Sequence, residues 1–288
     1  MTEELDDAVA VFNQVRPRLM GIAYRMLGSH AEAEDLVQEV WLRWQAADRS
    51  TVQSPTAYLS TAVTRLAINA SQSARARRET YVGPWLPEPV DTSADPYLGA
   101  ETGEALSFAV LLVLERLSPT ERAAYILREA FEYPYDELAA MLQSTEPAVR
   151  QLVSRARKRI RAERRTEVSG PQQKKLLTAF ITAARSGNLA VLEELLAKDA
   201  ISYSDGGGAA RASKFPVVGQ ERVAKYHRAF HKHFWVGVEV AFGTANGRAV
   251  ALLSRDGTVF AVCTVTASAA GIDEVLWQMN PAKLSAVA

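Results

Sequence analysis

The sequence is poor in cysteine, in net charge and in long hydrophobic runs, and each shortage excludes a class of protein. Cys263 is the only cysteine among 288 residues, so neither an intrachain disulfide nor a four-thiolate zinc site can form. The 33 basic and 33 acidic residues cancel, which excludes a highly charged nucleic-acid coat protein. No segment approaches the roughly 18 apolar residues that span a bilayer, and the acidic start Thr2–Asp7 is unlike a secretory signal. We expect a cytoplasmic protein with no membrane partner.

What is present indicates a globular protein of more than one domain. Hydrophobic residues make up 48% of the chain and charged residues 23%, and at about 150 residues per domain the length predicts two or three domains. Prolines gather between residues 79 and 104, and Gly170-Pro171 punctuates the chain again. The expected parts are a helical domain at 5–78, a Pro-rich linker at 79–104, a second helical domain at 105–166 and a C-terminal domain at 170–288.

Residues 5–78 show the periodicity of amphipathic helices. Apolar residues recur at helical spacing from Val11 to Ile22, and Ser29 is placed to cap the next helix, with Glu32 three residues later. That second helix carries an apolar stripe of Leu36, Val40 and Trp44, and a third helix leads into an arginine cluster at Arg75, Arg77 and Arg78.

Residues 105–166 contain a helix-turn-helix pattern. Ser118-Pro119-Thr120-Glu121 is a strong helix start, and a short helix Tyr135–Leu142 is followed by a turn and a second helix, Glu146–Arg161. Arginine dominates this second helix. A basic run is most often a solvated helix face, but its place in a helix-turn-helix favours binding to DNA.

The residues after Gly170 predict an α+β domain. Helices are expected at Leu176–Ala184, Leu189–Leu196 and Glu221–Phe234. Asn246-Gly247 and Asp256-Gly257 are hairpin turns between strands expected at Val236–Phe242, Ala249–Ser254 and Val259–Thr266. A last strand, Ile272–Met279, ends at Asn280-Pro281, so helices are followed by an antiparallel meander.

Two separate motifs carry a resemblance to a known family. Asp35-Leu36-Val37-Gln38-Glu39-Val40-Trp41-Leu42-Arg43 and Ala148-Val149-Arg150-Gln151-Leu152-Val153-Ser154-Arg155-Ala156-Arg157 flank the Pro-rich linker. In this order they resemble the extracytoplasmic-function (ECF) sigma factors of bacterial RNA polymerase. The C-terminal part resembles a rarer branch with a fused SnoaL-like, NTF2-like cone domain. That branch carries a Trp-Leu-Pro-Glu-Pro linker (here Trp85–Pro89), an Asp-Gly-Gly-Gly turn (Asp205–Gly208) and an Asn-Pro-Asp-Lys-Leu-like ending (Asn280–Leu284).

The chain departs from the family pattern at four positions. Arg65 and Asn69 replace the usual Asn and Asp of the helix that reads the −10 element. Gln143 stands in the helix-turn-helix turn where Gly is common, and Ala282 replaces the Asp of the ending motif.

The resemblance implies two all-α sigma domains, followed by the cone, and a protein that directs RNA polymerase to promoters. It implies polymerase core as a partner, through the β′ and β subunits, and promoter DNA as the other. Candidate polymerase-binding residues are Asp35, Leu36, Gln38, Glu39 and Arg43. Candidates for DNA binding are Arg65, Asn69, Arg75, Arg77, Arg78, Arg150, Gln151, Ser154, Arg155, Arg157 and Lys158. The first residues of a recognition helix read bases, and the later basic residues bind phosphates.

The C-terminal domain leaves more than one interpretation open. Asp205, His227, His231 and His233 are the candidates for chemistry, and His227 and His231 are spaced to share a helix face and hold a metal. The blander interpretation, surface histidines near aromatic packing, is favoured, so neither a metal, a cofactor nor a catalytic residue is expected. The resemblance implies instead that the domain tunes the sigma part in cis, in place of an anti-sigma protein. The residues expected to mediate this contact are Trp85, Leu86, Pro87, Glu88, Pro89, Asp205, Gly206, Gly207, Gly208, Asn280, Pro281, Lys283 and Leu284.

Two other functions remain as alternatives to a sigma factor. One is a helix-turn-helix repressor with a ligand-sensing domain, which gives no reason for the Asp35–Arg43 motif. The other is an isomerase- or cyclase-like enzyme fused to a DNA-binding part, which requires a polar dyad inside the cone. A small ligand in the cone, acting as a signal, is compatible with the regulatory interpretation.

Overall fold

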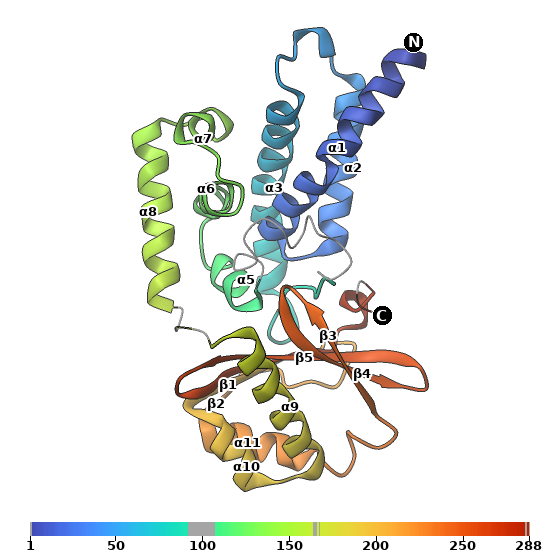
Figure 1. The fold of residues 1–288 in the computed structure, drawn as a ribbon, viewed down its shortest axis with the longest axis vertical. Helices are drawn as coiled ribbons and strands as arrows, with labels where there is room; N and C mark the ends of the chain where they lie inside the picture. The colour runs from blue at the N-terminus through green and yellow to red at the C-terminus, as the bar shows by residue number, and fades with distance from the viewer. Residues whose placement is uncertain (1, 92–106, 164–165, 167, 286, 288) are drawn as a thin grey trace. The chain divides into compact units, whose positions relative to one another are not determined.

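The computed structural model describes every residue except 1, 92–106, 164–165, 167, 286 and 288. The chain separates into two units, one helical and the other combining helices with a sheet (Figure 1). The first unit comprises Met1–Glu79 and Asp95–Arg164, and the second comprises Thr80–Ala94 and Arg165–Ala288. The described part of the expected linker, residues 80–91, therefore belongs to the C-terminal unit.

The first half of the helical unit is a three-helix bundle. Its elements are α1 (Thr2–Leu27), α2 (His30–Ala46), the short η1 (Arg49–Thr51) and α3 (Pro55–Glu79). Ser29 caps α2 by accepting a hydrogen bond from the Glu32 backbone, as the sequence predicted. α1 packs against both α2 and α3, and the side chains of Leu19, Ile22 and Leu59 are fully buried between them.

The second half of the helical unit holds the helix-turn-helix. Its elements are α5 (Phe108–Leu114), α6 (Pro119–Glu129), α7 (Tyr135–Met141) and α8 (Glu146–Glu163). The capping box predicted at Ser118 and Glu121 is present. α6 and α7 pack on α8, and α6 also contacts α1 and α3, so the two halves form one body. Gln143 adopts φ 50° in the turn between α7 and α8, which explains physically why glycine suits this position.

The C-terminal unit is a six-stranded sheet with helices on one face. Its elements are α9 (Gly170–Ser186), α10 (Leu189–Leu195), β1 (Leu196–Asp205), β2 (Val217–Val218), α11 (Gln220–Ala229), β3 (Glu239–Ala245), β4 (Arg248–Arg255), β5 (Thr258–Ser268), β6 (Gly271–Gln278) and η3 (Pro281–Lys283). The strand order is β2-β1-β6-β5-β4-β3, in which β1 and β6 are parallel and the other pairs antiparallel. The chain therefore has a helical part followed by a domain of helices and a mixed sheet, as the resemblance implied.

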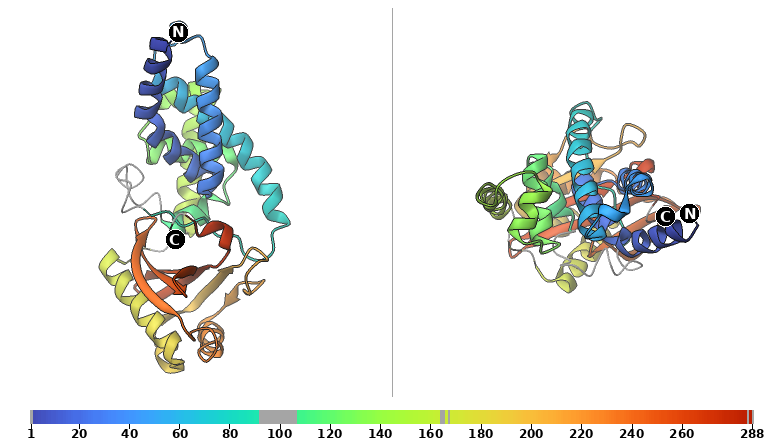
Figure 2. Two further views of the ribbon diagram at one scale, coloured as in Figure 1. Left: turned by 90° about the vertical axis from the view of Figure 1, so that its right-hand side faces the viewer. Right: turned by 90° about the horizontal axis from the view of Figure 1, so that it is seen from above.

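Two hydrophobic clusters lie on the two faces of this sheet. The larger packs α9, α10 and α11 against the sheet, with Phe180, Leu253 and Val275 fully buried. The smaller lies on the opposite face, where Leu284 covers Val250 and Val262. Figure 2 shows η3 on the side of the sheet away from the three helices. Both faces of the sheet are therefore covered, one by the three helices and the other by the segment around Leu284.

Two predicted elements have different bounds in the structure. The helix expected to reach Phe234 ends at Ala229, because a series of turns follows that places Phe234 and Trp235 in an aromatic cluster. The first strand of the meander, expected at Val236–Phe242, is instead Glu239–Ala245. The Asn246-Gly247 turn sets this register, since both residues have positive φ and join β3 directly to β4.

No helix in the part of the chain that the structure describes is long and apolar enough to cross a membrane.

Candidate functional site

The candidate polymerase surface is an exposed polar face of α2. Asp35, Gln38, Glu39 and Arg43 are all exposed, and Arg43 forms an i,i+4 ion pair with Glu39 at 2.6 Å. Leu36 differs from the other four candidates because its side chain is buried, at 6% exposure. Leu36 therefore anchors α2 in the bundle rather than contributing to the exposed face.

The candidate −10 residues on α3 are in two kinds of environment. Asn69 is exposed. The Arg65 guanidinium instead donates to the carbonyl oxygens of Met141, at 3.1 Å, and Ala140, at 3.2 Å. These carbonyls close the C-terminal turn of α7, where a cation is favoured by the helix dipole. Arg77 pairs with Glu32 on α2, and the Arg75 side chain lies outside the described residues.

Arg78 is half-buried in an ion-pair cluster. It donates to the Glu115 carboxylate and to the Leu27 carbonyl oxygen. Glu115 also pairs with Arg122 at 2.7 Å, and Arg122 donates to the Met26 carbonyl oxygen. Burial, together with the charge of Arg122, lowers the pKa of Arg78 to about 9. The cluster joins the two halves of the helical unit, and binding of Arg78 to DNA stays a prediction.

The recognition helix α8 presents a mixed polar face. Gln151, Ser154 and Lys158 are exposed and have no hydrogen bond or ion pair with any described residue. The neighbouring arginines Arg150, Arg155 and Arg157 are partnered. Arg150 lies over the Tyr135 ring at 4.1 Å and pairs with Glu146, and Arg155 pairs with Glu121 at 3.3 Å.

Arg157 is held more firmly than the other arginines of α8. Both its Nε and its Nη2 donate to Glu129 on α6, at 3.1 and 2.6 Å. This hydrogen bonding raises the pKa of Arg157. The opposite face of α8 is apolar: Val149, Val153 and Ile160 are buried.

The linker motif and the two C-terminal motifs meet around Asp205. We call residues 80–91 the strap. Asp205 is fully buried, and its carboxylate accepts hydrogen bonds from the Tyr81 hydroxyl at 2.6 Å and from the Leu86 backbone N–H at 2.9 Å. Lys283 pairs with the same carboxylate at 2.7 Å and donates to the Leu86 carbonyl oxygen. Because Asp205 is buried and fully engaged, it is a fixed anchor and not part of a flexible loop.

Apolar and aromatic contacts complete this end of the strap. The Lys283 ammonium lies 4.3 Å from the Trp85 ring and 4.9 Å from the Tyr81 ring, within cation–π range. Leu86, Pro87, Glu88 and Pro89 are all buried. Trp85 and Leu86 therefore dock on a surface of the C-terminal unit.

The sequence analysis missed several residues that hold the strap. Gln278 donates to the carbonyl oxygens of Leu86 and Pro87, and Tyr81 also accepts from Asn280 at 2.8 Å. At the other end, Asn246 accepts from the Val90 N–H and donates its own backbone N–H to the Val90 carbonyl oxygen. Asn246 was visible in the sequence only as a turn residue. Nothing in the local pattern indicated its partner, which lies 156 residues away.

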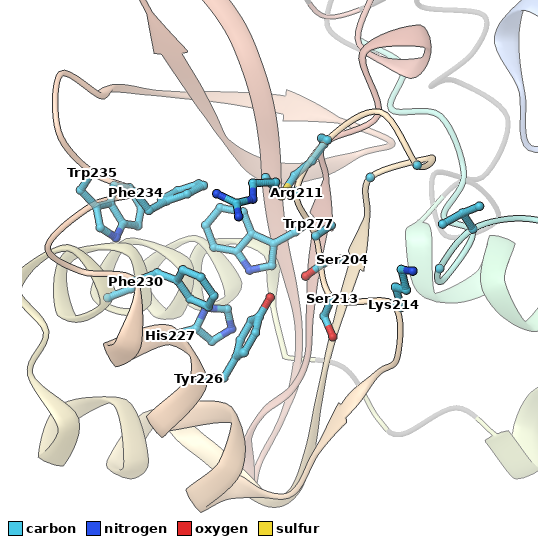
Figure 3. Close-up of a pocket in the computed structure, with 18 residues that line it drawn as sticks. Ser204, Arg211, Ser213, Lys214, Tyr226, His227, Phe230, Phe234, Trp235 and Trp277 are labelled. Atoms are coloured by element: carbon cyan, nitrogen blue, oxygen red, sulfur yellow. The ribbon is translucent and has the colours of Figure 1, made fainter.

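A cavity of about 630 Å³ opens in the C-terminal unit (Figure 3). Its wall includes Ser204 on β1, His227 on α11 and Trp277 on β6, together with the loop that follows Asp205. The strap contributes Val82 and Gly83. None of the described residues that line this cavity is Asp or Glu.

The candidate histidines do not come together. His227 is buried rather than on the surface, against the expectation, and its Nε2 lies 3.1 Å from the Ser202 hydroxyl. Burial lowers the pKa of His227 to about 3, so its ring is neutral. His231 lies in the turns after α11, with its Nδ1 2.7 Å from the Arg228 carbonyl oxygen. The described residues contain no group of three potential ligands that could hold a metal ion.

The chain was compared with known proteins and solved structures. Residues 11–78 match the family Sigma-70 region 2, and residues 107–160 match Sigma-70, region 4. The ECF RNA polymerase sigma factor SigJ of Mycobacterium tuberculosis is 39% identical over 224 residues, covering 76% of this chain and 71% of that protein. Probable ECF RNA polymerase sigma factor SigI of the same organism is 33% identical over 195 residues, covering 66% and 67%. The crystal structure of M. tuberculosis SigJ aligns with a TM-score of 0.76 and 31% identity over 96% of this chain and 98% of that one.

A three-helix bundle that matches region 2 and a helix-turn-helix that matches region 4 define a sigma-70-type transcription factor. More specifically, the chain belongs to the ECF RNA polymerase sigma factors. It directs polymerase to specific promoters, where transcription begins. The region 2 match gives the α1–α3 bundle a function that a plain helix-turn-helix repressor would not have.

Proposed function

We propose that this sigma factor is tuned in cis by its C-terminal domain, which holds the strap. The observation that carries the proposal is the anchoring of residues 80–91 around Asp205 at one end and Asn246 at the other. The strap follows α3 directly in the chain and leads toward α5. A domain that binds the strap is able to act on both promoter-reading halves of the protein.

Docking of the strap limits the length of chain available between the two helical halves. Unrestrained, a segment as long as the strap extends by up to roughly 40 Å. Hydrogen bonds and burial fix its path on the C-terminal sheet instead. Docking therefore removes conformational freedom from the linker that must accommodate the −10 and −35 elements at once.

In this proposal, different residues of the helical unit bind polymerase, DNA bases and DNA phosphates. Asp35, Gln38, Glu39 and Arg43 form the docking face for polymerase core, through its β′ and β subunits. Gln151, Ser154 and the two arginines Arg150 and Arg155 read bases of the −35 element, because they occupy the first turns of the recognition helix. Lys158 and Arg157 contact phosphates.

The form described here is the promoter-free form of the helical unit. Arg65 is hydrogen-bonded to the end of α7, and Arg78 is paired with Glu115. A residue with these partners must exchange them before it contacts melted DNA. Promoter binding then separates α3 from α7, and the single-stranded DNA replaces the α7 carbonyls as the partner of Arg65.

The C-terminal domain acts in this proposal without catalysis, in the cytoplasm where polymerase works. Its buried histidine is neutral, its only candidate aspartate is occupied by the strap, and no carboxylate lies among the described cavity residues. Fold similarity to enzymes does not supply a reaction.

Run-off transcription with polymerase core tests the proposal. The full chain is compared with Leu86→Ala, which removes the fully buried side chain of the strap, on promoters selected from random DNA. A Leu→Ala change in a core costs about 2–5 kcal/mol, enough to favour release of the strap. We expect the ratio of initiation on promoters of different spacer length to change.

The matched control is Leu192→Ala, which truncates an equally buried leucine on α10 away from the strap. If Leu86→Ala and Leu192→Ala have equal effects on spacer preference, tuning through the strap is wrong. Specific initiation by the full chain, measured in the same reactions, reports the sigma activity separately.

A further inference from the structure

The cavity of the C-terminal domain has aromatic walls. Its described lining includes six aromatic rings: Tyr226, His227, Phe230, Phe234, Trp235 and Trp277. Several of them contact one another edge to face, with Phe234 and Trp277 centroids 5.7 Å apart. Figure 3 shows these rings gathered around the open space. Its volume of about 630 Å³ lies within the range of small-molecule sites in proteins, about 300–1,000 Å³. The shape and lining suit a ring-bearing organic molecule.

The charge of the lining is of one sign. Arg211 and Lys214, on the loop after β1, border the cavity and are exposed. Neither has an ion pair or hydrogen bond with any residue that the structure describes. With no carboxylate among the described lining residues, these two cations set the electrostatic potential of the entrance. An anionic group is therefore favoured there.

Two polar groups that line the cavity lack a partner in the described protein. The hydroxyls of Tyr226 and Ser204 have no hydrogen-bond partner among the described residues. A few polar groups placed on an apolar wall fix the orientation of a bound molecule. A ligand with acceptor atoms on its ring system would satisfy both hydroxyls.

We propose that this cavity binds a ring-bearing organic anion, with the anionic group paired to Arg211 and Lys214 and the rings stacked among the aromatic side chains. The hydroxyls of Tyr226 and Ser204 donate to acceptors on the ring body. The cavity should therefore bind a planar or polycyclic carboxylate, sulfonate or phenolate more tightly than a neutral compound of the same shape.

The ligand would also touch the strap, and this part of the inference rests on the proposed function. Val82 and Gly83 belong to the strap and line the cavity. The loop on the other side approaches them closely: a Cβ built on Gly208 would lie 3.5 Å from the Val82 side chain, and one on Gly83 would lie 3.7 Å from the Ser213 carbonyl oxygen. A ligand that fills the space between loop and strap adds contacts to the docked strap only. Its binding therefore stabilises docking.

Fluorescence titration of the full chain with two dyes tests the site. The probes are 8-anilinonaphthalene-1-sulfonate and N-phenyl-1-naphthylamine, which share a ring system and differ by the sulfonate. We expect the sulfonate to bind at least tenfold tighter than the neutral dye. Arg211→Ala/Lys214→Ala should weaken sulfonate binding at least tenfold and leave the neutral dye unchanged.

The matched control is Arg222→Ala/Lys232→Ala, which removes one exposed arginine and one exposed lysine that do not line the cavity. This variant should bind both dyes as the unmodified chain does. If the two double variants bind the sulfonate equally well, or if the neutral dye binds as tightly as the sulfonate, the anion site is wrong.

Hydrogen exchange of the strap tests the coupling without any transcription assay. The backbone N–H groups of Leu86 and Val90 are bonded to Asp205 and Asn246, so their exchange reports docking. Saturating sulfonate dye should slow their exchange at least threefold in the unmodified chain and not in Arg211→Ala/Lys214→Ala. Dye binding with unchanged exchange overturns the coupling but not the site. If the dyes do not bind in the cavity, the ligand site is wrong, but the run-off test of cis tuning still gives its own result. Failure of the ligand site and failure of the proposed function are therefore distinguishable.

Discussion

At the scale of single residues, His227 shows how burial decides the state of a titratable group. The ring is enclosed by Phe180, Tyr226 and Trp277, and its only hydrogen-bond partner among the described residues is Ser202. No carboxylate compensates a charge there, so the pKa falls from 6.5 to about 3. A histidine that sequence spacing offered as a metal ligand is instead a neutral part of the core.

This shift predicts a pH dependence of stability. The folded pKa lies below the unfolded one, so the unfolded state binds the proton first as pH falls. The stability associated with His227 is complete above pH 6.5 and decreases by about 1.4 kcal/mol per pH unit below it, toward the folded pKa. Urea unfolding of the full chain at pH 7.5, 6 and 5 should show a smaller loss for His227→Gln than for the unmodified chain. Equal losses would contradict the burial of an uncharged ring.

Lys158 predicts a different kind of effect, on DNA affinity. Its ammonium is exposed on α8 and has no described partner, so it is available to a phosphate. Lys158→Ala should weaken binding of polymerase holoenzyme to all promoters alike and reduce the slope of log K against log salt by about 1. Gln151→Ala should instead relax the preference at one −35 base and leave the salt slope unchanged. A sequence-dependent effect of Lys158→Ala would contradict the phosphate assignment.

At the scale of elements, the Arg78–Glu115–Arg122 cluster joins α1, α3, α5 and α6. Glu115 pairs with both arginines. Glu115→Gln removes this shared carboxylate from two largely buried cations and should lower the free energy of unfolding of the helical unit by about 2–3 kcal/mol. Glu146→Gln, which removes the exposed pair with Arg150, should cost less than about 1 kcal/mol. Urea titration followed by tryptophan fluorescence measures both, and equal effects would show that the cluster does not join the halves.

The Asp205–Lys283 pair has the same role for the strap. Asp205→Asn removes the carboxylate that pairs with the buried Lys283 ammonium and should destabilise the C-terminal unit by about 3–5 kcal/mol. Adding Lys283→Met removes the buried charge itself and should recover a large part of that loss, in the same unfolding measurement. If the double variant is less stable than Asp205→Asn alone, the pair is not the main interaction of Lys283.

At the scale of the whole molecule, the strap makes the C-terminal domain and the linker one folding unit. A chain that ends at Val168 loses the sheet that covers Leu86, Pro87 and Val90. We expect limited proteolysis to cleave this truncated chain between residues 80 and 91 much faster than the full chain. Cleavage at equal rates would contradict docking of the strap, and cleavage in the basic helix α8 serves as the internal reference.

Much of the fold could be predicted from local pattern. The helix caps at Ser29 and Ser118, the helix-turn-helix and the hairpin turns at Asn246 and Asp256 follow from short-range chemistry and were found where expected. The misplaced elements, α11 and β3, lie where turns bring Phe234 and Trp235 into the aromatic cluster. Helical periodicity cannot reveal such a turn, because the packing partners are distant in sequence.

The site was predictable as a set of motifs but not as a set of contacts. The sequence by itself determined the three strap motifs, the exposed face of α2 and the basic helix α8, because residue type and spacing decide amphipathic faces and caps. Only the tertiary structure decided that Asp205 binds the strap, that Asn246 holds its far end, and that Arg65 and Arg78 are engaged within the helical unit. The physical reason is that burial and charge pairing depend on neighbours brought from far along the chain, which no local pattern specifies.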